Sequence, residues 1–126
     1  MLILVDTDVL IEIFDRNSEK GDKALKKIER TGEDITTTSL NLHEILYGLH
    51  KYTDHAKLER ILVLDVVEFT KDDAVLSSKL EVETGKMGKK VPRFDAMIAA
   101  VAINRGFKLF TFNRKHFEEF GDLTLV

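Results

Sequence analysis

The sequence predicts an α/β protein in which helices cover both faces of a parallel sheet. The first observation is the apolar run Leu2–Val5, which leaves no polar face and is typical of a strand buried on both sides. The second is the alternation of short β-branched or apolar segments with longer amphipathic segments along the chain. The third is the stretch at 96–103, which is apolar nearly all round and predicts a helix inside the protein.

Length and composition limit the protein to one globular domain. The chain has 126 residues, enough for one hydrophobic core. The absence of cysteine excludes disulfides and thiolate zinc sites. No apolar run is long enough for a membrane span and no basic segment precedes the first strand, so we expect a cytoplasmic protein without membrane contact. The net charge of −3 argues against binding nucleic acid through bulk charge, but not against a local basic surface.

The first half of the chain is expected to form two strands and four helices. Gly32 is a typical helix C-terminal stop, the β-branched stretch 35–38 favours a strand, and Ser39 or Asn41 can cap the helix after it. In order, the elements are a strand at 2–5, a helix to about residue 14, a helix at 22–30, a strand at 35–38, a helix to about residue 51 and a short helix at 54–60.

The second half is expected to add three strands and two helices. Asp72 or Asp73 starts the first of these helices, whereas Pro92 suits the first turn of the second and Gly106 its end. The segment 84–90 is expected to be a flexible basic loop. In order, the elements are a strand at 62–69, a helix to about residue 83, a helix at 92–106, and strands at 108–111 and 122–126.

Asp6 stands at the carboxyl end of the first predicted strand. Open α/β sheets bind ligands at this edge, so an acid there favours a functional role. The alternative is that Asp6 caps the helix that follows. Thr7 or Asp8 can fill that role instead, and we assign Asp8 to the cap or to the first helical turn, where the helix dipole favours an acid.

Two further acids interrupt or open apolar helices. Glu44 follows the second strand, where Asn41-Leu-His-Glu44 also fits a variant of the helix capping box, and the sequence leaves both roles open. Asp95 precedes the apolar stretch 96–103, where the helix dipole favours an acid, but burial there costs free energy unless a cation or a donor compensates. Together with Asp6, these acids would form an oxygen-rich cation site, which indicates metal-assisted phosphate chemistry.

Basic residues gather just before Asp95 and again after the fourth predicted strand. They form either a solvated loop or a phosphate-binding rim beside the acidic site, and the second role depends on the acids being a site. The residues are Lys86, Lys89, Lys90, Arg93, Arg114 and Lys115.

Four segments together resemble the PIN-domain ribonucleases, and within them the VapC-type toxins of toxin–antitoxin pairs. They are Leu4-Val-Asp-Thr-Asp-Val-Leu-Ile11, Thr38-Ser-x-x-x-x-Glu44 with Gly48 one turn on, Asp95-Ala-Met-Ile-Ala-Ala100, and Thr111-Phe-Asn-Arg-Lys-His-Phe117. Their order and spacing are specific in combination, and the resemblance spans nearly the whole chain.

The resemblance implies a single PIN domain over residues 1–126. Its fold would be a PIN-like three-layer α/β/α sandwich around a five-stranded parallel sheet with the strand order 3-2-1-4-5. In that order the direction of the sheet reverses at strand 1, which Asp6 follows. This agrees with the place where open α/β sheets bind ligands.

The resemblance also implies roles for individual residues. Asp6, Glu44 and Asp95 would be catalytic and would bind Mg²⁺ or Mn²⁺. Ser39 and Thr111 would flank them as hydroxyl partners, with an amide from Asn113. His116 departs from the pattern, because many relatives carry an acid at this position, so a second metal would bind more weakly. The RNA-binding residues would be Lys89, Lys90, Arg93 and Arg114.

The implied activity is metal-dependent hydrolysis of RNA phosphodiester bonds by the toxin of a toxin–antitoxin pair. A metal held by Asp6 and Asp95 would orient and acidify a water, while Glu44 binds the metal or acts as general base. The expected partners are the RNA substrate, a small DNA-binding antitoxin and a second copy of the chain in a homodimer.

Three other functions were weighed against this one. A haloacid-dehalogenase-like phosphatase also places Asp-x-Asp after an apolar strand, as in Asp6-Thr-Asp8, but Val9 stands where that family has glycine. A catalytically eroded PIN domain would only bind RNA or protein, and His116 is the feature that supports it. A response-regulator receiver is disfavoured, because no aspartate ends the third predicted strand.

Overall fold

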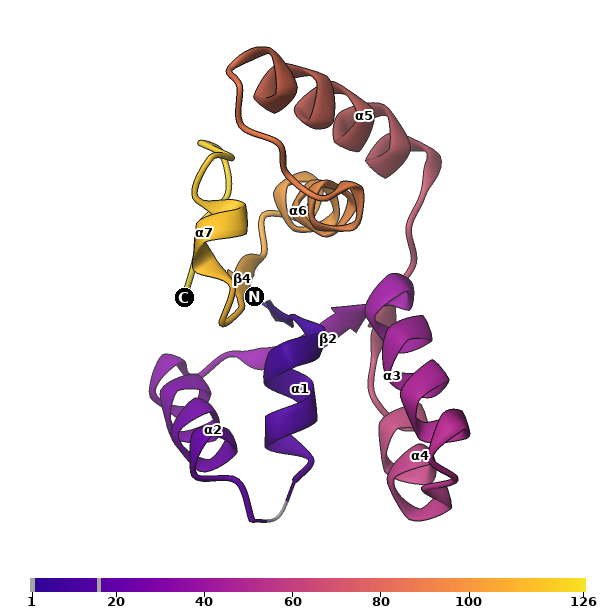
Figure 1. The fold of residues 1–126 in the computed structure, drawn as a ribbon. Coiled ribbons are helices and arrows are strands. Elements are labelled where there is room, and N and C mark those ends of the chain that lie inside the picture. Colours follow the sequence, from indigo (N-terminus) through magenta and orange to yellow (C-terminus); the bar gives the residue numbers. More distant parts are fainter. Residues whose placement is uncertain (1, 16) are drawn as a thin grey trace.

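The computed structural model of the protein describes residues 2–15 and 17–126. Its strands lie between two groups of helices, with α1 to α4 in the lower half of Figure 1 and α5 to α7 in the upper half. This is the predicted three-layer α/β/α arrangement. No helix in the described part of the chain combines the length and the apolar character needed to cross a bilayer.

The sheet is parallel throughout. Within the described residues it has four strands in the order β3-β2-β1-β4, namely β1 (Leu2–Val5), β2 (Asp34–Thr38), β3 (Val66–Val67) and β4 (Lys108–Phe110). The fifth predicted strand is reduced to one parallel bridge between Leu109 and Leu125, where the N–H of Val126 donates to the carbonyl of Leu109 at 2.9 Å. The fold class is confirmed, and the number of strands is the point of difference.

Alternate residues of β1 supply the two cores, as a strand between two helical layers requires. Ile3 and Val5 point to one side, where they pack with the helices α1 (Thr7–Ile13), α2 (Glu19–Thr31), α3 (Ser39–Lys51) and α4 (His55–Leu62). Leu4 points to the other side, towards α5 (Lys71–Lys86), α6 (Arg93–Arg105) and α7 (Arg114–Phe117). The apolar stretch 96–103 is a buried part of α6, as predicted.

The first helices fit together because Gly21 has no side chain. A Cβ atom built on Gly21 would lie 2.0 Å from the backbone oxygen of Glu12, so α2 approaches α1 as closely as only glycine permits. Ser18 caps α2 and accepts a hydrogen bond from the N–H of Gly21, so the helix begins three residues before the predicted start.

Three other features of the elements differ from the prediction. The strand at 62–69 is only Val66–Val67, because α4 continues through Leu62 and leaves few residues to pair with β2. The segment 84–86 belongs to α5, so the loop before α6 is shorter than expected. The helix α7 after β4 was not predicted, since four residues are too few for a periodic pattern.

Candidate active site

Asp6 is the centre of the candidate site. It directly follows β1, its backbone N–H donates to the carbonyl of Phe110 at 2.9 Å, and its side chain is only 7% exposed. Its Oδ1 accepts hydrogen bonds from the N–H of Thr7 and from Nδ2 of Asn41, both at 2.9 Å, and its Oδ2 accepts one from Oγ1 of Thr111 at 2.8 Å. Three donors from separate parts of the chain therefore fix the orientation of this carboxylate.

The cap of α1 is Asp6 itself, so the assignment of that cap to Thr7 or Asp8 was wrong. Asp8 lies in the first turn of α1 and accepts a hydrogen bond from the N–H of Phe112 at 3.2 Å. Burial raises the pKa of Asp8 above its ordinary value, and the negative charge of Asp6 raises it further. Asp8 is therefore a fourth acid at this edge of the sheet.

Asn41 holds α3 against the site, although no role beyond capping was predicted for it. It is completely buried, and Thr38 caps α3 through a reciprocal capping box with Asn41. The Asn41 amide then reaches both Asp6 and Oγ1 of Thr7, each at 2.9 Å. The pattern Thr38-x-x-Asn41 was a signal that could have revealed the capping box, but not the link to Asp6 and Thr7.

Glu44 lies on α3 beyond its capped first turn. Because Thr38 is the cap and Asn41 the partner in the capping box, the capping-box role considered for Glu44 is wrong. Its Oε1 instead accepts a hydrogen bond from Oγ1 of Thr7 at 2.6 Å, and the side chain is exposed at the rim of the site. Thr7 thus joins Glu44 to the network around Asp6.

Asp95 reaches the same space from the first turn of α6. Burial raises the pKa of Asp95 above its ordinary value, and a hydrogen bond and charge from His116 lower it again. The charges of Asp6 and Glu44 also raise it, which places the three predicted acids within electrostatic reach of one another. Nδ1 of His116 lies 2.8 Å from Oδ2 of Asp95.

The remaining predicted residues are placed as follows. Thr111 binds Asp6 directly, and the backbone N–H of Asn113 donates to Oγ1 of Thr111 at 3.1 Å, so Asn113 acts through its backbone. Oγ of Ser39 accepts a hydrogen bond from the N–H of Phe69 at 3.4 Å, beyond the end of β3, and contacts no acid of the site in the described structure.

The predicted basic rim makes contacts of its own. Nζ of Lys89 lies 2.9 Å from Oε2 of Glu119, and Arg93 binds Glu81 through two nitrogens. Arg114 donates to the backbone oxygen of Val126 at 2.6 Å. Lys90 is exposed in the loop before α6. Binding of RNA by these residues stays a prediction.

The donor set of the site suits a divalent cation such as Mg²⁺ or Mn²⁺. Carboxylate oxygens are the ligands that these ions prefer. A cation would also stabilise the ionised form of Asp95, which burial and, to a smaller extent, the charges of Asp6 and Glu44 disfavour. Among residues 2–15 and 17–126, no three histidine or acidic side chains already stand close enough together to hold one ion. The carboxylates are suitable ligands for such an ion. To bind it, Glu44 and Asp95 would release their hydrogen bonds to Thr7 and His116.

A comparison with known protein families matches residues 3–123 to the model of the PIN domain. The chain belongs to the PIN domain family. Its sequence is 28% identical over 123 residues to Ribonuclease VapC1 of Methanocaldococcus jannaschii. The matched region covers 94% of this chain and 83% of that protein.

Solved structures support the same fold. One similar structure is that of VapBC2 from Rickettsia felis bound to a DNA fragment from their promoter, with a TM-score of 0.84, 23% identity and coverage of 100% of this chain and 98% of that one. Another is DNA-bound VapBC from Salmonella typhimurium, with a TM-score of 0.84, 24% identity and the same coverage of 100% and 98%. At this level of identity the likeness shows that the PIN fold is shared.

Proposed function

We propose that this PIN domain is a metal-dependent ribonuclease that hydrolyses phosphodiester bonds of RNA and acts as the toxin of a toxin–antitoxin pair. The observation that carries the proposal is that Asp6 and Glu44 both bind Thr7, and that Asp95, whose pKa is raised by burial, is raised further by the charges of these two acids. The similarity to Ribonuclease VapC1 supports the activity, and the likeness to VapBC structures supports the class of partner.

The three acids differ in how firmly they are held, and this suggests different roles. Asp6 is fixed by three hydrogen bonds and is the rigid anchor. Glu44 is exposed and bonded only through Oε1 among the described contacts, so Oε2 is available to accept a proton from the attacking water. Asp95 presents the oxygen that His116 does not bind.

Asp6, Asp95 and Glu44 would hold a divalent cation, which would supply positive charge for the phosphate oxygens and lower the pKa of the attacking water. The oxygen of water then bonds to phosphorus while the bond from phosphorus to the 3′ oxygen breaks. Glu44 takes the proton of the water, and solvent protonates the 3′ oxygen that leaves. The products carry a 5′-phosphate and a 3′-hydroxyl.

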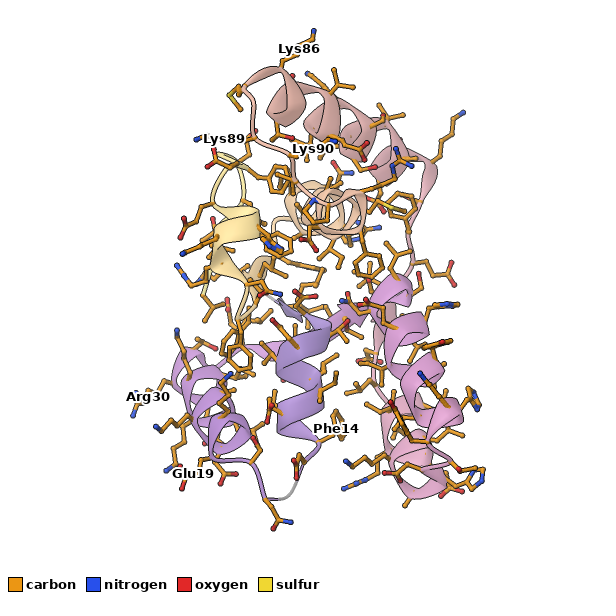
Figure 2. The ribbon with its side chains drawn as sticks, in the orientation of Figure 1. Phe14, Glu19, Arg30, Lys86, Lys89 and Lys90 are labelled. Carbon is orange, nitrogen blue, oxygen red and sulfur yellow. The ribbon has the colours of Figure 1, made fainter. Side chains whose placement is uncertain are left out.

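The partner is proposed to bind beside the acids. An apolar cavity of about 340 Å³ lies between α1, α3 and α4, and its wall includes Ile11, Phe14, Tyr52 and Glu44. Figure 2 shows Phe14 at the end of α1, on the side that faces α3 and α4. An apolar antitoxin segment can pack here while a basic side chain next to it reaches Glu44 and the other acids.

The decisive experiment compares RNA cleavage with cleavage of a small phosphate ester. The wild-type protein should cut a single-stranded RNA when Mg²⁺ or Mn²⁺ is added and should stop when EDTA removes it, with p-nitrophenyl phosphate left intact. Asp6→Asn and Glu44→Gln should remove the cleavage. Metal binding without RNA cleavage would instead show a catalytically eroded domain, and hydrolysis of the small ester would favour the phosphatase.

A further inference from the structure

Phe112 is an exposed aromatic ring at the edge of the acidic site. It follows Thr111, whose hydroxyl binds Asp6, and its own N–H donates to Asp8. The ring packs edge-on against Phe110, with 6.0 Å between the centroids and 85° between the planes. Phe112 is 37% exposed, whereas Phe110 is 4% exposed. The backbone on either side is thus tied to site residues, while the ring remains accessible.

Lysines of α2 lie over these two rings. Nζ of Lys20 is 4.8 Å from the centroid of Phe112, and Nζ of Lys27 is 5.3 Å from that of Phe110. Residues seven apart on a helix share a face, and Lys23 lies between them at helical spacing. We call Lys20, Lys23 and Lys27 the α2 lysine edge. Of the three acids of the same helix, Asp22 and Glu29 are also seven apart and project from another side, whereas Glu19 lies beside Lys23 at the start of the helix.

The α2 lysine edge begins beside the site. The ammonium group of Lys20 lies over the ring of Phe112, whose N–H donates to Asp8. Phe112 also follows Thr111, whose hydroxyl binds Asp6. A strip of positive charge therefore begins at the site and continues along α2, on a chain whose net charge is −3.

The rim predicted from the sequence is less available for phosphates. Lys89 and Arg93 are already paired with Glu119 and Glu81, and a phosphate would have to displace a carboxylate from each. In Figure 2, Lys89 and Lys90 lie towards α5, away from α2, which carries Arg30. The two basic surfaces can therefore be tested separately.

We infer that Phe112 and the α2 lysine edge form the RNA-binding platform of this site. An unpaired base stacks on the ring of Phe112, and Lys20 and Lys27 bind the phosphates on either side of that nucleotide. The ammonium group of Lys20, on a flexible stem, moves from the ring to the phosphate when the base arrives. Stacking requires a base that is free of a duplex, so the platform selects single-stranded or looped RNA with little preference for base identity. This inference rests on the proposed ribonuclease function.

Binding should be measured by fluorescence anisotropy with a fluorescein-labelled single-stranded RNA of twelve nucleotides, in EDTA so that the RNA stays intact. Phe112→Leu keeps an apolar side chain against Phe110 but removes the stacking face, and should weaken binding about tenfold without changing the salt dependence. Phe112→Tyr should bind within about twofold of wild type, because its ring still stacks.

Replacing the lysines should change the salt dependence of binding, which replacing Phe112 leaves unchanged. In the double variant Lys20→Gln and Lys27→Gln, the slope of log affinity against log salt should fall by about 1.4, or roughly 0.7 per phosphate contact on a single strand. The matched control, Lys89→Gln with Lys90→Gln, removes the same charge from the predicted rim. It should change the slope by less than about 0.7, the value for one phosphate contact. Thermal unfolding of each variant shows whether it is folded.

Unchanged affinity in Phe112→Leu, or a larger loss in the control than in the α2 variant, would overturn the inference. So would a failure of wild-type protein to bind the RNA. Cleavage of the same RNA with Mg²⁺ separates this inference from the proposed function. If wild type cuts the RNA and the variants bind like it, the platform is wrong and the ribonuclease stands. If wild type binds through Phe112 and the lysines but cuts nothing, the ribonuclease proposal fails.

Discussion

The imidazole of His116 holds the carboxylate of Asp95, with 2.8 Å between Nδ1 and Oδ2. The contact joins α7 to α6 across the rim of the site and engages one of the two oxygens that Asp95 could offer to a cation. His116 was singled out in the sequence because an acid is common there in proteins that resemble this chain. Because His116 lies beside Asp95, an acid at position 116 would be close enough to help to bind the same cation.

Replacing His116 with an acid should therefore strengthen metal binding. His116→Asp frees the Asp95 oxygen and adds a carboxylate, so Mn²⁺ should bind at least about tenfold more tightly, the size of effect known for changes around metal ligands. Calorimetric titration measures the affinity, and RNA cleavage should become half-maximal at lower metal concentration. His116→Ala is the control, since it frees the oxygen without adding charge. A loss of cleavage that added Mn²⁺ does not restore would show that His116 contacts the phosphate or the leaving oxygen instead.

Asp95→Asn should separate activity from stability. The pKa of Asp95 is raised by burial and by neighbouring acids, so its ionised form is disfavoured in the folded protein without metal. Removing the charge should abolish Mg²⁺-dependent cleavage while the melting temperature stays the same or rises. Asp72→Asn, an exposed acid in the first turn of α5, is the control and should leave cleavage intact. Full activity in Asp95→Asn would exclude Asp95 from the metal site.

Asp73 should make the fold sensitive to acid, through a different mechanism. Burial alone would raise its pKa, but hydrogen bonds from Arg105, Asn104 and Thr70 outweigh burial and lower the pKa to about 2. A lowered pKa means that the ionised form stabilises the fold above the ordinary pKa of 3.8, and that this contribution is lost as the pH falls towards 2. The shift corresponds to about 2 kcal/mol.

The prediction is that Asp73→Asn lowers the free energy of unfolding at pH 7 by about 3 kcal/mol, because it leaves Arg105 partly buried without its charge partner. The dependence of stability on pH between 4 and 2 should flatten in the same variant. Urea unfolding across this range measures both quantities. A variant whose acid dependence matches wild type would mean that other acids control the transition.

A homodimer is expected, and the structure narrows the surface that could form it. Leu42 and Leu46 of α3 pack against the core beside β1 and are not free to form an interface. Tyr47 remains 65% exposed on α3. Tyr47→Asp should therefore shift the protein from dimer to monomer in sedimentation at micromolar concentration. A wild-type monomer under these conditions would remove the expectation.

The sequence located the acids because their positions follow from the ends of secondary structure. Asp6 after β1 and Asp95 at the start of α6 can be found wherever a buried strand or an apolar helix is recognised. The network that orients Asp6 was not predictable in this way. Whether Asn41 bonds within its own helix or reaches a neighbouring one depends on how close α1 and α3 pack, which local patterns do not encode.

The errors in the fold have a related cause. Alternation at 62–69 resembled a long strand, but burial of Ile61 on the amphipathic α4 favours helix through Leu62. The last predicted strand pairs with only one residue of β4. Its length is therefore set by how much of β4 is available for pairing, and not by its own β-branched residues. Edge strands and helix ends are thus set by tertiary contacts, whereas the central strand and the buried helix are set by their own sequence.

The antitoxin proposal predicts that complex formation and catalysis can be separated. Ile11 is 54% exposed and lines the apolar cavity between α1, α3 and α4. The hydrogen bonds that hold the acids of the site come from other residues. Ile11→Glu places a negative charge where the apolar segment of the partner should pack, and should weaken the complex by about tenfold or more. RNA cleavage by the isolated protein should stay near wild type, because Ile11 contributes no ligand or proton acceptor.

The measurement is co-expression with the product of any small gene found next to the gene of this protein. Growth, co-purification and RNA cleavage are then recorded with and without that product. Val75→Glu, which introduces the same charge on an exposed valine of α5, is the control and should leave the complex intact. In the wild-type complex, cleavage should be blocked, because a basic side chain beside the apolar segment neutralises Glu44 and its neighbours. If Ile11→Glu binds as tightly as wild type, the cavity is not the docking surface. If no stable complex forms and growth inhibition persists, the toxin–antitoxin assignment fails while the ribonuclease proposal can stand.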